Sequence, residues 1–384
     1  MSLPTHHLYV HVPFCRLVCA YCDFVTVGGR GGEIPRYGAA LLAELALRPA
    51  SGQLATIYFG GGTPSLLPPS AVERLVQSAR DRWGTDPSEV SLEANPSAHE
   101  TPDWAGLRAA GVNRISLGIQ ALRDAELWTL ARGQTAGEGL AAFAAARAAG
   151  FANVSVDLIY GIPGQSEAVW RDGLARAVAL EPDHLSLYAL QLALVPDEWA
   201  APPRPGALRW RQRMVPRQDD GLAAAQYEAA EELLDRVGYL HYELSSWARP
   251  GFESRHNSAY WERRPYTGIG AGAHSYDGET RAWNDRDLDR YLARTDAGER
   301  ALAGAEHLDE PTRAFEAVAL GLRRVAGFSR AAFAAEFGQD PWERYPSAVE
   351  EQVATGLIEV AGDAIRLTPR GRLFANEALV AFAP

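Results

Sequence analysis

The chain has 384 residues and a formal net charge of -11, with 37 basic residues against 48 acidic ones. This balance argues against tight, unspecific binding to nucleic acid, because such binding needs an excess of basic side chains facing phosphates. The length exceeds the usual limit of a single core, so we expect one main domain and an appendage. Neither an apolar run of about 18 residues nor a signal peptide is visible, and we therefore expect a cytoplasmic protein.

The basic residues are all arginines, because the sequence contains no lysine. A chain without lysine cannot form a Schiff base, use a lysine as general base or build the phosphate loop that depends on one. Abundant Ala, Arg, Gly and Pro make a genomic composition bias the simplest cause. The excluded chemistries stay excluded whatever the cause.

In chain order, short apolar and β-branched runs alternate with amphipathic stretches over the first half of the sequence. The predicted strands are residues 8–12, 56–59, 90–93, 114–118, 153–159 and 184–190. The predicted helices are residues 36–47, 69–83, 102–110, 124–131, 136–149 and 167–179. Six strand-helix units predict a parallel sheet, either a closed or partly open barrel or a doubly wound open sheet. The barrel is favoured because unusual residues follow strand ends, which converge on one mouth in a barrel.

The three cysteines, Cys15, Cys19 and Cys22, lie within eight residues of one another. Structural cysteines would be scattered through the core, and three is the wrong number for a disulfide framework. Three thiolates in one loop can each hold one iron of a cubane cluster and leave the fourth iron open. A zinc site that adds His11 as fourth ligand is the alternative.

The spacing Cys-x3-Cys-x2-Cys, with Tyr21 directly before the third cysteine, resembles that of the radical S-adenosylmethionine (SAM) superfamily. The resemblance implies a partial (β/α)6 barrel, a [4Fe-4S] cluster and SAM bound at the open iron. Runs 92–96, 115–120 and 156–165 look like those of its coproporphyrinogen III dehydrogenase and haem chaperone (HemN/HemW) family, over nearly the whole chain. The residues that this resemblance places around SAM are Tyr9, Tyr21, Gly60, Gly61, Gly62, Thr63, Glu93, Gln120, Arg132 and Asp157. Among them, Arg132 is expected to bind the SAM carboxylate.

Two features favour the chaperone branch of this family. The dehydrogenases carry a fourth cysteine where Phe24 stands, and a longer leader precedes their cluster motif. The run from His256 to Tyr260 is similar to the His-Asn-x-x-Tyr haem-binding signature of the chaperones. We therefore assign His256 and Tyr260 to haem, with His256 as a candidate iron ligand, because histidine is a usual axial ligand. The plain alternative is a histidine that only hydrogen-bonds a neighbour.

Some segments depart from the family or stay open. Gln134 stands where the family commonly has a histidine, and residues 195–198 replace a Glu-Pro-Gly-Thr-like turn. Composition favours a linker over a lid for the Arg- and Pro-rich residues 202–217. The glycine-rich residues 266–275 could form a phosphate cradle, but no lysine follows them, and in this family the loop lies near the cofactor.

We expect three regions: a core barrel (1–240), an extension with the His-Asn-x-x-Tyr element (241–304) and a smaller C-terminal α+β, winged-helix-like domain (305–384). In the last region helical stretches 310–325, 330–337 and 346–355 precede a hairpin turning at Gly362 and a final helix. Winged helices can bind DNA, but the chain is acidic. We therefore expect this domain to cover the barrel or to contact a partner.

Taken together, the resemblance implies a haem chaperone that holds a [4Fe-4S] cluster and SAM and carries haem to respiratory membrane proteins. Transient membrane association, and a monomer or a homodimer, are compatible with this hypothesis. The alternatives are an oxygen-independent coproporphyrinogen III dehydrogenase, which cleaves SAM to a 5′-deoxyadenosyl radical, and a zinc-stabilised scaffold.

Overall fold

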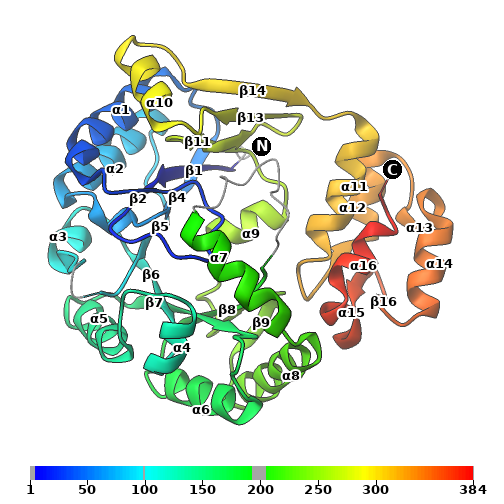
Figure 1. Ribbon diagram of the computed structural model, residues 1–384. Coiled ribbons are helices and arrows are strands. Elements are labelled where there is room, and N and C mark those ends of the chain that lie inside the picture. The colour runs from blue at the N-terminus through cyan, green and yellow to red at the C-terminus, as the bar shows by residue number, and fades with distance from the viewer. Residues whose placement is uncertain (1–4, 98–99, 193–204, 384) are drawn as a thin grey trace.

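A computed structural model describes residues 5–97, 100–192 and 205–383. Its main element is a 12-stranded sheet with strand order β14-β13-β12-β11-β1-β4-β5-β6-β7-β8-β10-β9. Figure 1 shows this sheet curled into a ring with helices around its outside, and a separate group of C-terminal helices at one side. The architecture is thus an α/β barrel with a smaller appended domain, as the sequence predicts.

Six strands of the barrel are parallel and neighbour one another in chain order. They are β1 (Thr5–Val12), β4 (Gln53–Gly61), β5 (Glu89–Ala94), β6 (Arg114–Gln120), β7 (Asn153–Tyr160) and β8 (His184–Ala189). The helices between them are α1 (Ile34–Leu47), α2 (Pro69–Trp83), α3 (Trp104–Ala109), α4 (Asp124–Thr129), α5 (Ala136–Ala148) and α6 (Glu167–Val178), with the 3-10 turns η1 (Gly31–Glu33) and η2 (Pro64–Leu66). All six predicted units are confirmed, and the sequential strand order excludes the doubly wound alternative.

Local sequence explains where several of these helices begin and end. Thr135 and Glu138 form a capping box at the start of α5, in which each side chain bonds the backbone of the other residue. Gly84 ends α2 with a φ of 62°, a left-handed conformation that glycine adopts without strain. Such signals lie within a few residues of each end, so they can be read from the sequence.

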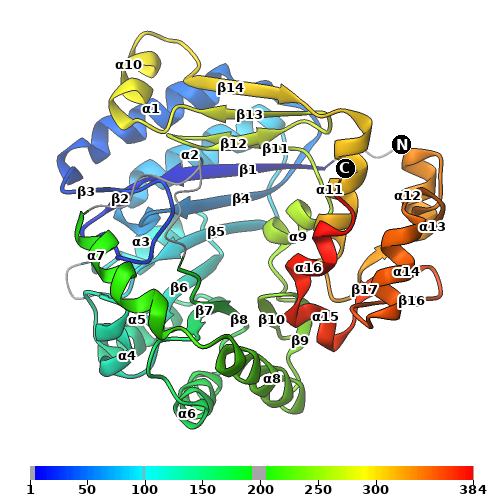
Figure 2. The same ribbon diagram turned by 45° about the vertical axis from the view of Figure 1, so that its right-hand side comes forward.

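Later residues extend the barrel sheet at both edges. At one edge β9 (Leu240–Glu243) and β10 (Ser246–Ala248) run antiparallel beyond β8. At the other edge β11 (Tyr266–Ile269) is parallel to β1 and is followed by β12 (His274–Tyr276), β13 (Thr280–Asn284) and β14 (Leu302–His307). The accompanying helices are α8 (Asp220–Arg236), α9 (Arg255–Trp261) and α10 (Leu288–Asp296). Figures 1 and 2 place α9 inside the ring, toward the end where the parallel strands begin.

The C-terminal domain has its own hydrophobic core, which includes Val318, Phe333, Val349 and Ile365. Its elements are α11 (Glu310–Gly321), β15 (Phe328–Ser329), α12 (Arg330–Phe337), α13 (Pro341–Arg344), α14 (Pro346–Ala354), β16 (Ile358–Ala361), β17 (Ala364–Leu367), α15 (Pro369–Leu373) and α16 (Ala375–Val380). Strand β15 lies between α11 and α12 and joins the later hairpin of β16 and β17 in one three-stranded sheet, so the predicted smaller α+β domain is confirmed. The division at 240/241 and 304/305 remains a proposal, and its limits fall within β9 and β14.

Helix α7 (Pro205–Met214) and the 3-10 turn η3 (Val215–Arg217) occupy most of the stretch for which composition favoured a linker. Trp210 and Arg211 of α7 are buried, and Figure 2 shows α7 beside β2, at the end of the barrel where the parallel strands finish. Helix α7 is therefore packed onto the barrel, so the prediction of a linker is wrong for these described residues. The altered turn at residues 195–198 lies outside the described residues. Among those described, no helix is long and apolar enough to cross a membrane.

Candidate functional site

The three cysteines lie in a segment that leaves the C-terminal end of β1, which we call the cluster loop (residues 13–28). Its two ends pair in parallel through β2 (Phe14–Cys15) and β3 (Val27–Gly28). Across the same closure, the Val27 N–H donates to the Pro13 carbonyl at 2.8 Å. The cluster loop is thus closed at its base and presents its thiols to one space.

That space is a cavity of about 350 Å³ at the carboxyl ends of the parallel strands. It is lined by the three cysteines and by eight residues that the family resemblance assigns to SAM: Tyr21, Gly61, Gly62, Thr63, Glu93, Gln120, Arg132 and Asp157. The remaining two, Tyr9 and Gly60, do not line it. Strand ends that are far apart in the sequence meet here because parallel strands of a barrel end at one mouth.

Glycines 61 and 62 allow the cluster loop to approach strand β4 closely. Gly61 has a φ of 118°, and a Cβ there would lie 2.6 Å from the His11 ring. A Cβ on Gly62 would lie 2.7 Å from the Pro13 carbonyl oxygen, and the Gly62 N–H donates to Val12 at 2.8 Å. These contacts give the glycine run a packing role beside the ligand-binding role that the resemblance implies.

Arg132 is turned toward the cluster loop and the strand ends. Its guanidinium donates to the Cys19 sulfur at 3.1 Å, to the Gly118 carbonyl at 2.7 Å and to Gln134 at 3.0 Å. Gln134 in turn donates to the Ile119 carbonyl at 2.8 Å. A neutral amide at position 134 therefore orients Arg132, which explains how the site accommodates the absence of the family's histidine.

Two carboxylates line the cavity in different surroundings. Glu93 accepts hydrogen bonds from the Tyr58 hydroxyl at 2.8 Å and the Gly61 N–H at 3.1 Å, and burial raises its pKa to about 7. Asp157 accepts from the Ser116 hydroxyl at 3.1 Å, and burial raises its pKa as well. Both can accept hydrogen bonds from ribose hydroxyls, the role that the resemblance implies.

Gln120, which the family resemblance assigns to the site, has an unusual backbone conformation, and two neighbours of the site, Asn95 and Glu100, were not assigned from the sequence. Gln120 has a φ of 70° beside an irregularity in the β6–β7 pairing, and backbone strain of this kind clusters at functional sites. Asn95 lines the cavity and donates to Glu100 at 2.9 Å, while Glu100 accepts the Arg16 N–H of the cluster loop at 3.3 Å. Asn95 lies two residues after Glu93, within the run 92–96 that carries the family resemblance, but no role was assigned to it from the sequence.

The residues present fit an iron-sulfur cluster with SAM. Three thiols from one loop line a cavity whose other walls offer a guanidinium, two carboxylates and backbone groups. Burial raises the pKa of Cys15 to about 12 and that of Cys22 to about 11, so their thiolates need positive iron ions beside them. With both groups bound, the site would supply one-electron chemistry.

The zinc alternative lacks its fourth ligand in this arrangement. His11 Nε2 donates to the Val25 carbonyl at 2.8 Å, and Nδ1 accepts from the Tyr9 hydroxyl at 3.0 Å. Among the described residues, no three His, Cys, Asp or Glu side chains stand close enough to bind one metal ion. The donor set therefore favours the cluster over a Cys3His zinc site.

The structure places His256 away from this cavity, inside the barrel. Its side chain is 0% exposed, with Nδ1 2.7 Å from the Thr56 hydroxyl oxygen and Nε2 2.9 Å from that of Tyr260. Glu89 also accepts the His256 N–H at 3.2 Å and so fixes the start of α9. Both ring nitrogens are engaged in hydrogen bonds here, and the assignment of His256 and Tyr260 to haem stays a prediction. The four-residue spacing brings the His256 ring and the Tyr260 hydroxyl into contact.

We expect His256→Ala to lower the free energy of unfolding of the haem-free protein by about 3 kcal/mol, because it deletes a buried ring and leaves the buried Tyr260 hydroxyl without its partner. The Thr56 hydroxyl keeps its second hydrogen bond, to His7 at 2.8 Å. Urea denaturation without haem measures this change. Ser258→Ala, which removes one hydroxyl from the same helix, is the control and should have a small effect. Unchanged stability combined with lost haem uptake would instead favour a ligand role for His256.

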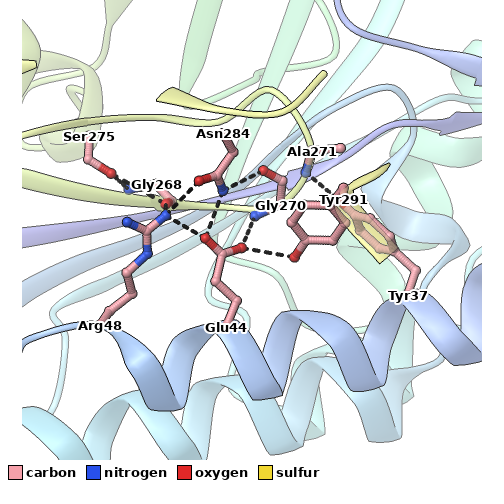
Figure 3. Close-up of polar contacts among 9 residues, drawn as sticks. All are labelled: Tyr37, Glu44, Arg48, Gly268, Gly270, Ala271, Ser275, Asn284 and Tyr291. Atoms are coloured by element: carbon pink, nitrogen blue, oxygen red, sulfur yellow. Dashed lines mark hydrogen bonds and ion pairs between the residues drawn. The ribbon is translucent and has the colours of Figure 1, made fainter. Parts of the chain in front are cut away.

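A buried polar network supports the cluster loop from behind (Figure 3). Glu44 of α1 pairs with Arg48 and accepts hydrogen bonds from the Gly270 N–H at 2.8 Å, the Tyr291 hydroxyl at 2.9 Å and Asn284 at 2.7 Å. Glu44 is 0% exposed and Arg48 is 3% exposed. The carboxylate therefore has its charge and its lone pairs satisfied entirely within the fold.

This network holds the glycine-rich residues 266–275 against the base of the cluster loop. Tyr37 donates to the His11 carbonyl at 2.8 Å and accepts the Ala271 N–H at 2.9 Å. A Cβ on Gly270 would lie 2.4 Å from the His11 carbonyl oxygen, and one on Gly272 would lie 2.9 Å from Val25. The Gly270 and Ala271 amides donate to Glu44 and Tyr37 within the fold, so these two N–H groups are not free to hold a phosphate.

Comparison with known proteins supports the same assignment. The family model of the radical SAM superfamily matches residues 9–173, and that of the HemN C-terminal domain matches residues 308–374. A Mycobacterium tuberculosis protein named heme chaperone HemW is 39% identical over 376 residues, covering 96% of this chain and 92% of that protein. The Bacillus subtilis protein of the same name is 32% identical over 379 residues, covering 97% and 98%.

Among solved structures, coproporphyrinogen III oxidase (HemN) from Escherichia coli, a radical SAM enzyme, matches with a TM-score of 0.83 and 23% identity. The match covers 99% of this chain and 90% of that one, and at this identity it shows the shared fold alone. The sequence relatives span nearly the whole chain at 32–39% identity, and the cysteine motif lies where the superfamily model matches. The chain therefore belongs to the HemW family of the radical SAM superfamily.

Proposed function

We propose that the protein is a haem chaperone that holds a [4Fe-4S] cluster and SAM, binds haem and delivers it to respiratory haem proteins. The observation that carries the proposal is the 39% identity, over 96% of the chain, to a protein named heme chaperone. Position 24 supports it, since the dehydrogenase branch carries a cysteine where this chain has Phe24, a side chain that is 67% exposed.

In this proposal Cys15, Cys19 and Cys22 hold the cluster, and the chain's other cavity residues hold SAM. Arg132 supports the cluster ligand Cys19 by donating a hydrogen bond to its sulfur. Glu93, whose pKa is raised to about 7, and Asp157 face the ribose. Tyr9 has a supporting role, because its hydroxyl donates to His11 next to the cluster loop.

The proposed setting is the cytoplasm, with haem received there and passed to acceptor proteins of a respiratory membrane. Contact with the membrane would be transient, and the protein would act as a monomer or a homodimer without a nucleic-acid partner. The exposed apolar side chains on the cluster loop, Leu17 at 53% and Phe24 at 67%, support contact with an apolar ligand or acceptor.

Anaerobic reconstitution with iron and sulfide, followed by two assays, tests the proposal. We expect saturable haem uptake by absorbance titration and no conversion of coproporphyrinogen III under reducing conditions with SAM. Conversion at an enzymatic rate would establish the dehydrogenase in its place. Failure of the wild-type protein to bind haem would reject the chaperone function.

The cluster assignment is tested separately by Cys19→Ser. We expect this variant to lose the iron-sulfur absorbance and most of its bound iron after the same reconstitution, because one of three ligands is gone. Ser65→Ala, a hydroxyl change just beyond the glycine run, is the control and should retain the cluster. Zinc in place of iron and sulfide in the wild-type protein would contradict the assignment.

A further inference from the structure

Hydroxyl groups from three neighbouring strands surround the Asp157 carboxylate, which lines the cavity at the strand ends (Figure 2). Ser116 of β6 lies 3.1 Å from both carboxylate oxygens, and Ser155 of β7 donates to one of them at 3.3 Å. Ser186 of β8 is in direct register with Asp157. Burial raises the pKa of Asp157, while hydrogen bonding to these serines and the charge of Arg114 counter the rise. The fold thus supplies donors to the ionised form of a carboxylate that it also buries.

Ser155 is also one link in a longer chain of hydrogen bonds that leads away from the cavity. Its hydroxyl oxygen lies 2.8 Å from His184 Nδ1, and His184 Nε2 lies 2.8 Å from the Tyr242 hydroxyl oxygen. The Tyr242 oxygen accepts the N–H of Ser254, which caps α9, at 3.3 Å. Ser155 and His184 are fully buried and are direct neighbours in the β7–β8 register. Neither His184 nor Tyr242 lines the cavity.

The direction of each bond in this chain follows from the hydrogens available. Burial and the charge of Arg114 lower the pKa of His184 well below its usual value, so the ring is neutral and carries one N–H. The Tyr242 oxygen accepts a backbone N–H, and its own hydrogen is directed to His184 Nε2. His184 Nδ1 then carries the proton and donates to Ser155, whose single hydrogen is left for Asp157. Every donor therefore points toward the carboxylate, an arrangement that favours its ionised form.

We infer that His184 is a positioning residue for SAM, an inference that rests on the proposed binding of SAM in this cavity. Acting through Ser155, it holds the Asp157 carboxylate ready to accept hydrogen bonds from the ribose hydroxyls, although its own ring does not line the cavity. A buried histidine with a purely structural role would leave SAM binding unchanged when its distant hydroxyl partner is removed. This difference can be measured.

Titration of the anaerobically reconstituted full-length protein with SAM, followed by calorimetry, tests the chain from its far end. Tyr242→Phe deletes the hydroxyl that donates to His184 Nε2. The ring proton then moves to Nε2, and Nδ1 accepts the Ser155 hydrogen in place of Asp157. We expect the Kd for SAM to rise about fivefold, because the carboxylate loses a charge-assisted hydrogen bond.

Ser155→Ala removes the same hydrogen bond directly and should raise the SAM Kd by a similar factor. The double variant Ser155→Ala/Tyr242→Phe should then bind SAM about as well as either single variant, because both changes act on one interaction. Independent effects that multiply in the double variant would contradict a chain through His184. The iron-sulfur absorbance, which should be retained in all three variants, shows that the cluster is loaded.

The pH dependence of SAM binding separates this role from a general loss of stability. Asp157 accepts ribose hydroxyls in its ionised form, so SAM binding weakens as the pH falls through its pKa. Loss of the Ser155 hydrogen bond raises that pKa, and in Tyr242→Phe the weakening should therefore begin at a higher pH than in the wild type. The charged and titratable groups that face Asp157 are the same in both proteins: Tyr58 of β4, Glu93 of β5, Arg114 of β6 and Tyr188 of β8.

Tyr239→Phe is the matched control. Tyr239 directly precedes β9, is buried, and donates its hydroxyl hydrogen to the Pro182 carbonyl, outside the chain that leads to Asp157. We expect its SAM Kd to stay within twofold of the wild-type value, with the same pH profile. Equal weakening in this control, or a wild-type Kd and pH profile in Tyr242→Phe, would overturn the role of His184 and leave the proposed function standing. Failure of the wild type to bind SAM would overturn both this inference and the SAM site of the proposed function.

Discussion

Glu44→Ala is expected to lower the free energy of unfolding by about 4 kcal/mol, because it leaves the buried Arg48 guanidinium without its partner. The loss extends beyond the ion pair. The Gly270 N–H and the Tyr291 hydroxyl lose the acceptor that they share, as Figure 3 shows. Both groups lie in the interior, where an unpaired donor is costly. Urea denaturation of the cluster-free protein measures the change.

Asp296→Ala is the matched control for this prediction. Asp296 pairs with Arg36 of the same helix α1, but both side chains are 52% exposed. An exposed pair contributes under about 1 kcal/mol, since water screens it and holding two long side chains costs entropy. A similar loss in the two variants would show that the Glu44 network is no stronger than a surface contact. We also expect Glu44→Ala to release iron faster, because residues 266–275 no longer brace the cluster loop.

Acid is expected to destabilise the haem-free protein steeply between pH 6.5 and 4. His6, His7 and His11 are buried, and burial lowers the pKa of each to about 4. Burial also lowers the pKa of His184 and His256 well below the usual value. Above pH 6.5 these rings are neutral in both states, and stability is unaffected. Below it the unfolded chain binds protons that the folded chain cannot, so stability falls by about 3 kcal/mol for each of the first three by pH 4.

Glu93 opposes this trend over part of the same range. Burial raises the pKa of Glu93 to about 7, so its ionised form lowers the stability of the folded state at high pH. This destabilisation disappears as the pH falls toward 4.5, because the buried carboxyl group is then protonated. Asp157, whose pKa burial also raises, acts in the same direction. Two carboxylates do not offset five histidines, and we expect net loss of stability in acid. Urea midpoints measured from pH 4.5 to 8 should show it. His6→Gln, which can keep a bond to Thr267, should reduce the slope, and a flat profile would contradict the prediction.

The sequence by itself determined the six strand-helix units, the cysteine motif and eleven of the residues that line the cavity at the strand ends. Strands buried on both faces leave apolar runs, helix caps are local, and parallel strand ends converge once a barrel is assumed. Tertiary structure alone decided the position of His256, whose spacing to Tyr260 is the same for a ligand pair and a buried hydrogen bond. It also decided that α7 packs on the cluster loop, and that Glu44 reaches Gly270 across 226 positions of the chain. Such contacts join residues whose separation carries no periodic signal, so only the folded chain reveals them.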